Sequence, residues 1–314
     1  MQVADGAYDA PYHAPVLVAE VLQHLGHARD VLDGTLGGGG HTAALIETGA
    51  TVTALDHDPA AIAAARVRLG AAERRGVFRL VQANFADVDD VVVLDGLLFD
   101  GILLDLGVSS HQLDDASRGF TFREGAPLDM RMGDDAAMDA ATWLATSEVP
   151  ALAQAFREWA DEPKAMRLAR VIEKRRANAP LLVSNDLVGA IREALGARSG
   201  PGDFARLFQA VRIAVNGELT ALERALPTLR DRLGPGGVMA VIAYHSGEDR
   251  LVKHAFRAWS EECTCPPRQL HCTCGGQNAL GDVVTKRAVT ASEAEGRRNP
   301  RARSARLRVW RRRG

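Results

Sequence analysis

Four consecutive glycines constrain this chain more than any other feature of its sequence. They lie in the stretch VLDGTLGGGGHT, residues 31–42, after a short apolar run that ends in Asp33 and before a helical pattern. Glycine loses more conformational entropy on ordering than other residues, so an ordered run of four indicates a close approach to the backbone that side chains would block. A strand, a glycine turn and a helix start, in this order, are typical of a nucleotide-binding site in an open sheet.

Short apolar runs alternate with helical patterns through the first third of the chain. The runs predict strands at 30–33, 51–56, 78–82 and 99–105, and the segments 41–48, 59–69 and, less regularly, 86–93 predict the crossovers between them. This alternation is typical of a parallel sheet with helices on both faces. We therefore expect an α/β fold with a Rossmann-like, doubly wound and mostly parallel sheet.

The alternation of strands and helices stops near Ser110. Helices are predicted at 139–160, 164–176 and 184–195, and a helix at 218–233, a turn at 235–237 and strands at 238–246 and 306–310 follow. The stretch without strands is expected to be a helical insertion that recognises the substrate. The expected division is a core in two parts, 1–109 and 211–314, around an insertion at 110–210, with a cysteine-containing loop and an arginine-rich tail in the second part.

Two nucleotide-binding patterns fit the glycines. Residues 38–43 satisfy G-x-G-x-x-A of dinucleotide sites, and residues 33–39 satisfy D-x-x-x-G-x-G, the first motif of methyltransferases that use S-adenosylmethionine. Asp33 is placed to meet a ligand's ammonium group, and Asp56, at the end of the second predicted strand, to accept hydrogen bonds from two ribose hydroxyls. Asp56 lies 16 residues past Gly40, short of the roughly 20 expected for a dinucleotide site. The acids favour S-adenosylmethionine, with an NAD-dependent oxidoreductase, or acids that only cap helices, as alternatives.

Several longer stretches resemble the ribosomal RNA small subunit methyltransferase H family. They are residues 13–22, 33–42, 54–62, 208–219, 245–253, 299–308 and, as the most specific, FDGILLDLGVSSHQLDDASRGFTFREGAPLDMRM at 99–132. The resemblance implies a class I methyltransferase core with a helical insertion and S-adenosylmethionine as methyl donor. It implies methylation of the exocyclic N4 amino group of a cytidine in 16S rRNA, in the decoding region of the small ribosomal subunit. A non-catalytic ribosome assembly factor that keeps the site as part of its fold is a further alternative.

The resemblance also implies which residues contact the methyl donor. The family's contacts fall on Gly39, Gly40 and His41 in the glycine turn, Asp56 at the ribose, Phe85 beside the adenine, and Asp105 and Gln112. Asp105 is also the candidate catalytic residue, because an amino group with a delocalised lone pair needs an acceptor for its hydrogens. The alternatives are that Asp105 only binds the cofactor, and that His41, which can titrate near neutral pH, is a base rather than a helix-start residue facing the cofactor.

Two C-x-C pairs lie six residues apart in CTCPPRQLHCTCG. Cys263, Cys265, Cys272 and Cys274 could bind Zn²⁺ tetrahedrally in a reduced compartment, with His271 as a weaker spare ligand. The spacing within each pair is tighter than the usual two to four residues. A loop with ordinary reduced cysteines is therefore the alternative to a zinc site.

The formal net charge of −2 conceals an uneven distribution of arginine. Residues 297–313 contain nine arginines and no acid, which suggests a polyanionic partner. The alternative is a general preference for arginine, since only four of the 38 basic residues are lysine. The resemblance implies that the partner is 16S rRNA in the small ribosomal subunit. No run reaches the roughly 18 apolar residues of a membrane span, and the first residues lack the pattern of a signal peptide. We therefore expect a cytoplasmic protein with no membrane partner. The oligomeric state is open between a monomer and a homodimer.

Overall fold

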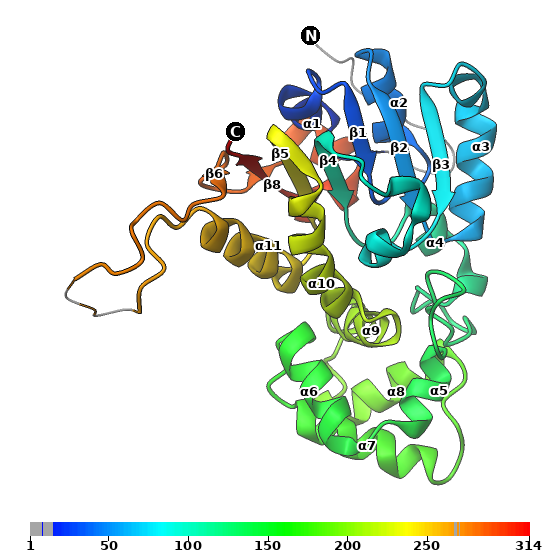
Figure 1. Ribbon diagram of the computed structural model, residues 1–314. Helices are drawn as coiled ribbons and strands as arrows, with labels where there is room; N and C mark the ends of the chain where they lie inside the picture. The colour runs from blue at the N-terminus through cyan, green and yellow to red at the C-terminus, as the bar shows by residue number, and fades with distance from the viewer. Residues whose placement is uncertain (1–7, 9–14, 267–268, 270) are drawn as a thin grey trace. The chain divides into compact units, whose positions relative to one another are not determined.

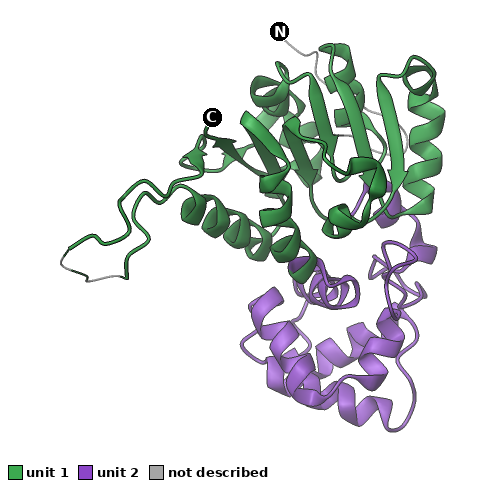
Figure 2. Cartoon of the chain, in the orientation of Figure 1, with its two compact units in different colours: residues 1–107, 220–314 green, residues 108–219 purple. Residues whose placement is uncertain are grey.

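The computed structural model describes residue 8 and residues 15–266, 269 and 271–314. The chain divides into two compact units, with residues 1–107 and 220–314 in unit 1 and residues 108–219 in unit 2 (Figure 2). Unit 2 extends nine residues beyond the expected boundary at 210. The expected boundary at residue 210 falls inside one continuous helix, α9 (Pro201–Asn216). The apolar side chains of this helix belong to the core of unit 2, so the whole helix is part of that unit.

Unit 1 contains one eight-stranded sheet (Figure 1). Its strands are β1 (Asp30–Asp33), β2 (Thr51–Asp56), β3 (Phe78–Gln82), β4 (Phe99–Asp105), β5 (Leu233–Ala243), β6 (Gly281–Val283), β7 (Val289–Thr290) and β8 (Arg306–Arg312). Their order is β3-β2-β1-β4-β5-β8-β6, with β7 also paired to β8. The first five strands are parallel and β8 runs antiparallel to β5. The predicted α/β fold with a mostly parallel, doubly wound sheet is confirmed, and β1 to β4 have the predicted bounds.

Helices pack on both faces of this sheet because successive residues of each buried strand point to opposite faces. On one face Val31 and Leu103 pack with apolar residues of α1 (Val18–Leu25), α2 (Gly40–Glu47) and α3 (Pro59–Arg74). On the other, Leu32 and Ile102 pack with residues of α10 (Glu218–Asp231) and α11 (Ser246–Trp259). Among the described residues, no helix is both long and apolar enough to cross a bilayer.

Two local predictions were wrong. The crossover predicted at 86–93 is two short 3₁₀ turns, η1 (Phe85–Asp90) and η2 (Val92–Leu94), because a run of β-branched valines and acids has low helix propensity. The turn predicted at 235–237 lies within β5 instead. There the pairing between β4 and β5 shifts register between Phe99 and Gly101, which accommodates the Pro-Gly-Gly segment as a bulge.

Unit 2 is helical in its described residues, apart from one isolated bridge between Pro127 and Val183. Besides α9 it contains α4 (Ser110–Asp114), η3 (Ala116–Arg118), α5 (Ala140–Thr146), α6 (Val149–Ala160), α7 (Ala165–Arg176) and α8 (Ser184–Leu195). The helix predicted at 139–160 is therefore two helices. Their apolar faces form a core of their own around Leu152, Phe156 and Leu168. Unit 2 thus has the helical character that the sequence predicted for the insertion.

The arginine-rich end is folded into unit 1, and the strand predicted at 306–310 is confirmed. This end forms α12 (Glu293–Arg298), η4 (Pro300–Ser304) and β8, which lies inside the sheet between β5 and β6. Arg308 pairs with the buried Asp249 through two hydrogen bonds of 2.6 and 3.0 Å. Arg312 donates to three backbone carbonyls, and Arg313 pairs with Glu262 and Asp282. These three guanidinium groups hold β8 to its surroundings, while Arg297, Arg303 and Arg306 are exposed, so a contact of this segment with a polyanion stays a prediction.

Candidate active site at the carboxyl edge of the sheet

Polar side chains follow one another along the carboxyl edge of the sheet in unit 1. Strand β1 ends at Asp33, β2 at Asp56 and β4 at Asp105, and Tyr244 directly follows the last residue of β5. These four strands are neighbours and run parallel (Figure 1). Ligands of open α/β sheets bind outside this edge, where the strand order reverses. The three acids that the sequence selected are therefore brought to one place.

The glycine turn connects β1 to α2 and bonds to the end of β2. Gly37 N donates to Asp56 Oδ2 at 2.7 Å, and both Gly37 and Gly39 have left-handed backbones, with φ of 51° and 71°. A Cβ on Gly39 would lie 2.9 Å from Leu69 Cδ1, and one on Gly40 would lie 2.7 Å from Pro15 Cγ, whereas one on Gly37 would meet nothing within 4 Å. The protein's own side chains therefore require glycine at Gly39 and Gly40, and the open approach is at Gly37.

Asp33 is buried behind this turn, with a relative exposure of 1%. Its Oδ2 accepts a hydrogen bond from Thr42 Oγ1 at 2.7 Å, and its Oδ1 accepts one from Thr35 N at 3.1 Å. Burial raises the pKa of Asp33 to about 6, against the opposing effect of the Thr42 hydroxyl. Asp33 thus ties both ends of the glycine turn together, and its contact with a ligand's ammonium group stays a prediction.

Asp56 is held by backbone groups on both sides. Besides the bond from Gly37, its Oδ1 accepts from Asp58 N at 2.9 Å. Burial raises the pKa of Asp56, and the two backbone bonds lower it. Phe85 opens η1 after β3, and its Cβ lies 3.3 Å from the position that a Cβ on Gly34 would take. An aromatic ring and a fixed carboxylate therefore flank the glycine turn.

Asp105 and Tyr244 form a buried pair at the ends of β4 and β5. Tyr244 OH donates to Asp105 Oδ1 at 2.8 Å, and Asp105 N donates to Thr35 Oγ1 at 2.5 Å. Burial raises the pKa of Asp105 to about 7; the Tyr244 hydroxyl lowers it and the nearby charge of Glu248 raises it. The carboxyl group therefore changes its protonation state near neutral pH. This property is typical of a group that exchanges protons with a substrate.

His41 reaches the same carboxyl group from the first turn of α2. Its Nε2 lies 2.8 Å from the carbonyl oxygen of Val16, which can only accept, so we assign the proton to Nε2. Burial lowers the pKa of His41, so the ring is neutral at pH 7. Its unprotonated Nδ1 then faces Asp105 Oδ2 at 3.6 Å, which is too long for a hydrogen bond. The position fits a helix-start residue, and a role as base stays a prediction.

Tyr244 and Glu248 are site residues that the sequence analysis missed. Glu248 Oε2 accepts from Tyr244 N at 2.8 Å and from His245 N at 3.3 Å, which fixes the chain where it leaves β5. Burial raises the pKa of Tyr244 well above its ordinary value, so its hydroxyl remains a donor. The strand predicted at 238–246 extended past Tyr244, so this side chain was not recognised as standing at a strand end as the three aspartates do.

Other predicted residues lie elsewhere in the chain. Gln112 belongs to unit 2, where its Oε1 accepts from Ser109 N at 2.8 Å and it caps α4, so its contact with a cofactor stays a prediction. The four cysteines gather in the loop between α11 and β6, apart from the carboxyl edge.

A family model decides the class of protein. The model of the MraW methylase family matches residues 10–313, which is nearly the whole chain. The chain belongs to the MraW methylase family. It is therefore a methyltransferase, and the alternative of an NAD-dependent oxidoreductase has no support.

Curated relatives of this MraW-family chain share one name. Proteins called Ribosomal RNA small subunit methyltransferase H from Gemmatimonas aurantiaca, Heliobacterium mobile and Myxococcus xanthus are 62%, 46% and 46% identical to it. The matches cover 96%, 95% and 95% of this chain and 95%, 98% and 96% of those proteins. Among solved structures, a putative rRNA-methylase from Clostridium thermocellum matches with a TM-score of 0.42 and 11% identity, over 95% of this chain and 98% of that one. That likeness is too distant to inform the site.

Proposed function

We propose that this chain transfers a methyl group from S-adenosylmethionine to the exocyclic N4 amino group of a cytidine in 16S rRNA. The names of the relatives, which match over nearly their whole length, support the small-subunit rRNA as substrate. The observation that carries the chemistry is the Asp105 carboxyl group, buried at the end of β4, with a pKa of about 7 and a hydrogen bond from Tyr244.

The residues of the carboxyl edge fit the proposed methyl donor. Among the proposed contacts with the donor, that of Asp56 has the strongest structural support. Each of its carboxylate oxygens accepts one backbone N–H and keeps a lone pair for a ribose hydroxyl. The open space at Gly37 would let the donor approach the backbone, and Phe85 would pack against the adenine. The proposed contacts are Asp33, Gly39, Gly40, His41, Asp56, Phe85, Asp105 and Gln112.

The chain's part in the reaction is positioning and proton handling. S-adenosylmethionine, when bound, supplies an electrophilic methyl group on sulfur, which the cytosine nitrogen attacks in line. Asp105 would accept a hydrogen bond from the amino group, which orients the nitrogen and increases its electron density. Holding both reactants in this geometry can supply most of the rate acceleration.

Proton transfer completes the proposed cycle. The attacking nitrogen would gain a bond to the methyl carbon while the bond from that carbon to sulfur breaks, its electron pair staying on the departing thioether. The nitrogen must then lose one proton. Asp105, ionised above a pKa of about 7, takes that proton and later releases it to water. Tyr244 is the positioning residue in this scheme, because its hydroxyl donates to Oδ1 and fixes the plane of the carboxylate.

The test is methylation of small ribosomal subunits from cells that lack the gene. Purified protein and labelled donor should add one methyl group per subunit, and mass mapping should place it on N4 of one cytidine in 16S rRNA. Naked 16S rRNA is the parallel substrate, which shows whether the assembled subunit is required. Binding to subunits without methyl transfer would instead support an assembly factor, and a methyl group on another atom would contradict the proposed chemistry.

The oligomeric state and the cellular compartment stay predictions. Light scattering of the purified chain distinguishes the monomer from the homodimer. Cell fractionation tests the expected cytoplasmic location.

A further inference from the structure

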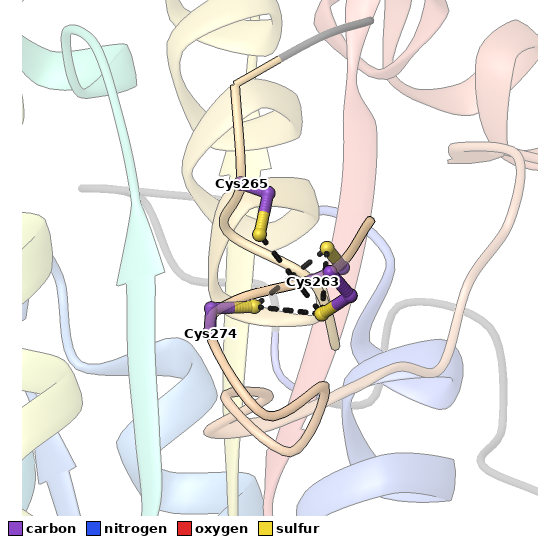
Figure 3. Close-up of side chains that lie close together, drawn as sticks. Cys263, Cys265 and Cys274 are labelled. Carbon is purple, nitrogen blue, oxygen red and sulfur yellow. Dashed lines mark hydrogen bonds between the residues drawn. The ribbon is translucent and has the colours of Figure 1, made fainter. Parts of the chain in front are cut away.

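The loop between α11 and β6, residues 260–280, carries all four cysteines of the chain and projects from unit 1 (Figure 1). We call Cys263, Cys265, Cys272 and Cys274 the cysteine cluster. Their sulfur atoms all lie within 4.8 Å of one another. Figure 3 shows the side chains pointing to a common centre. No apolar core surrounds them, since these residues are exposed or half-exposed, so hydrophobic packing does not bring them together.

The spacing of the sulfur atoms matches the edges of a tetrahedron around zinc. Four of the six Sγ–Sγ distances are 3.5 Å for Cys272–Cys274, 3.6 Å for Cys263–Cys274, 3.7 Å for Cys263–Cys272 and 3.9 Å for Cys265–Cys272. Four sulfurs at a Zn–S distance of about 2.3 Å are about 3.8 Å apart. Disulfide sulfurs would be about 2.05 Å apart. An iron–sulfur cluster places several atoms between its cysteines and would separate them further.

The two C-T-C segments support each other's sulfurs in the same way. Thr264 N, in the first segment, donates to Cys274 Sγ at 3.3 Å, and Thr273 N, in the second, donates to Cys265 Sγ at 3.3 Å. Each segment thus points the amide of its central threonine at a sulfur of the other segment. Amide hydrogen bonds to sulfur favour the thiolate, which is the form that binds metals.

We propose that the cysteine cluster binds one Zn²⁺ ion in a closed structural site. Four thiolates in tetrahedral array suit zinc, and a closed set of four protein ligands is typical of structural rather than catalytic zinc. His271 is not a ligand, because it does not belong to the cluster of converging groups. The ion would close the loop near its base, where Leu280 N bonds to Trp259 O at 2.7 Å and Asn278 N to Glu262 O at 3.1 Å.

Metal analysis of the full chain tests the site without any activity measurement. The protein is purified with reductant and without chelator, and zinc is measured by mass spectrometry of the elements. We expect about one zinc per chain, and a cobalt-substituted protein with the absorption of a tetrahedral thiolate complex. The double variant Cys265→Ser/Cys272→Ser should lose the metal and the cobalt spectrum, while the matched loop variant His271→Ala should keep both.

Each contrary result overturns the site as proposed. A zinc content below about a tenth of an ion per chain after anaerobic reconstitution would contradict the proposed zinc site. Iron bound in place of zinc would contradict it as well. Disulfides mapped in protein kept under reductant, or zinc retained by the double variant, would have the same consequence. The loop is exposed, so circular dichroism of the double variant should show an intact fold and exclude misfolding as the cause of metal loss.

Discussion

The carboxyl edge of the sheet and the cysteine cluster both gather groups of like charge, but they do so by opposite means. Each acid of the edge is buried or half-buried and is engaged by donors of the protein: Asp33 by Thr42, Asp56 by Gly37 and Asp105 by Tyr244. The cysteines are exposed or half-exposed, and their sulfurs contact one another and backbone N–H groups of the same loop. The fold organises the carboxyl edge before any ligand binds. The cysteine cluster, by contrast, is proposed to need a bound Zn²⁺ ion to hold its four sulfurs together.

This difference has a consequence for where function and stability lie. A preorganised site can act on a substrate without reorganising its own dipoles, which is the main electrostatic advantage of an enzyme. A site ordered by its ligand contributes binding energy to the folding of its own segment instead. Changes at the edge should therefore alter turnover and global stability, and changes at the cluster should alter only the loop.

The largest effect is expected from Asp105→Asn. The amide cannot take a proton, so turnover on small subunits should fall about 10²–10⁴-fold. The affinity for S-adenosylmethionine, measured by calorimetry, should stay within about threefold, because the amide oxygen can still accept from Tyr244. Asp95→Asn, at an exposed loop position, is the matched control. Normal turnover in the Asp105→Asn variant would end the catalytic role.

The same variant should change how stability depends on pH. The folded-state pKa of Asp105 is raised to about 7 from an ordinary 3.8, so the unfolded chain releases this proton first. The carboxyl group therefore costs the wild type stability as pH rises from about 4 to 7, by roughly 2–4 kcal/mol at pH 8. Denaturant unfolding of both proteins at pH 4 and pH 8 measures it. The Asp105→Asn variant should gain relative stability at pH 8, and a constant difference would show that Asp105 is not buried as described.

Gly39→Ala tests whether the turn is built by the fold. The new methyl group would meet Leu69 at 2.9 Å on a backbone with φ of 71°, so the free energy of unfolding should fall by about 1–3 kcal/mol. Gly49→Ala is matched in its positive φ of 97° but meets no atom within 4 Å, and so isolates the backbone strain. Equal losses in the two variants, measured by urea unfolding, would contradict the packing argument.

A smaller effect is expected from Tyr244→Phe. Loss of the hydroxyl removes the hydrogen bond that lowers the pKa of Asp105, so the rise of turnover with pH should move from about 7 to higher pH. The rate at pH 7 should then fall about 3–10-fold and recover partly at pH 9. A pH profile of single-turnover methyl transfer shows the shift. A uniform loss at every pH would indicate a purely structural role for Tyr244.

Removal of the proposed zinc ion is expected to have the smallest effect on the rest of the molecule, outside the loop that binds it. A chelator should increase amide hydrogen exchange in the loop 260–280, while exchange in β1, β4 and β5 stays unchanged, because the sheet does not depend on the cluster. The matched measurement uses the Cys265→Ser/Cys272→Ser variant, which should not respond to chelator. Faster exchange in the central strands would show that the two regions are coupled, and the comparison between them would fail.

The sequence predicted the carboxyl edge well because buried parallel strands are short apolar runs, and an acid at the end of each run is visible. Asp33, Asp56 and Asp105 were found in this way. Tyr244 was missed because tyrosine is ordinary in a strand, and its bond to Asp105 joins residues 139 apart. The need for glycine at Gly40 depends on Pro15, a contact that only the folded chain creates.

For the cysteines, the sequence left two possibilities open, a set of four converging thiols and a loop of separate ones. The C-x-C spacing is compatible with separate thiols, and only the backbone path of the loop brings both pairs to one centre. The arginine-rich segment shows the same limit. The sequence predicted its strand at 306–310, but the acids that pair with its arginines, such as Asp249 and Glu262, lie far away in the sequence and could not be named from it.

Strand β8 gives the molecule an unusual order of assembly. The ribosome makes it after every other strand of the sheet, yet it lies between β5 and β6 and carries the fully buried Trp310. Until β8 has been synthesised, the nascent chain has an unpaired strand edge along β5 and an exposed apolar surface. Such a surface is bound by chaperones or aggregates. Translation that halts before residue 306 would therefore release an incomplete sheet for degradation rather than a shortened enzyme.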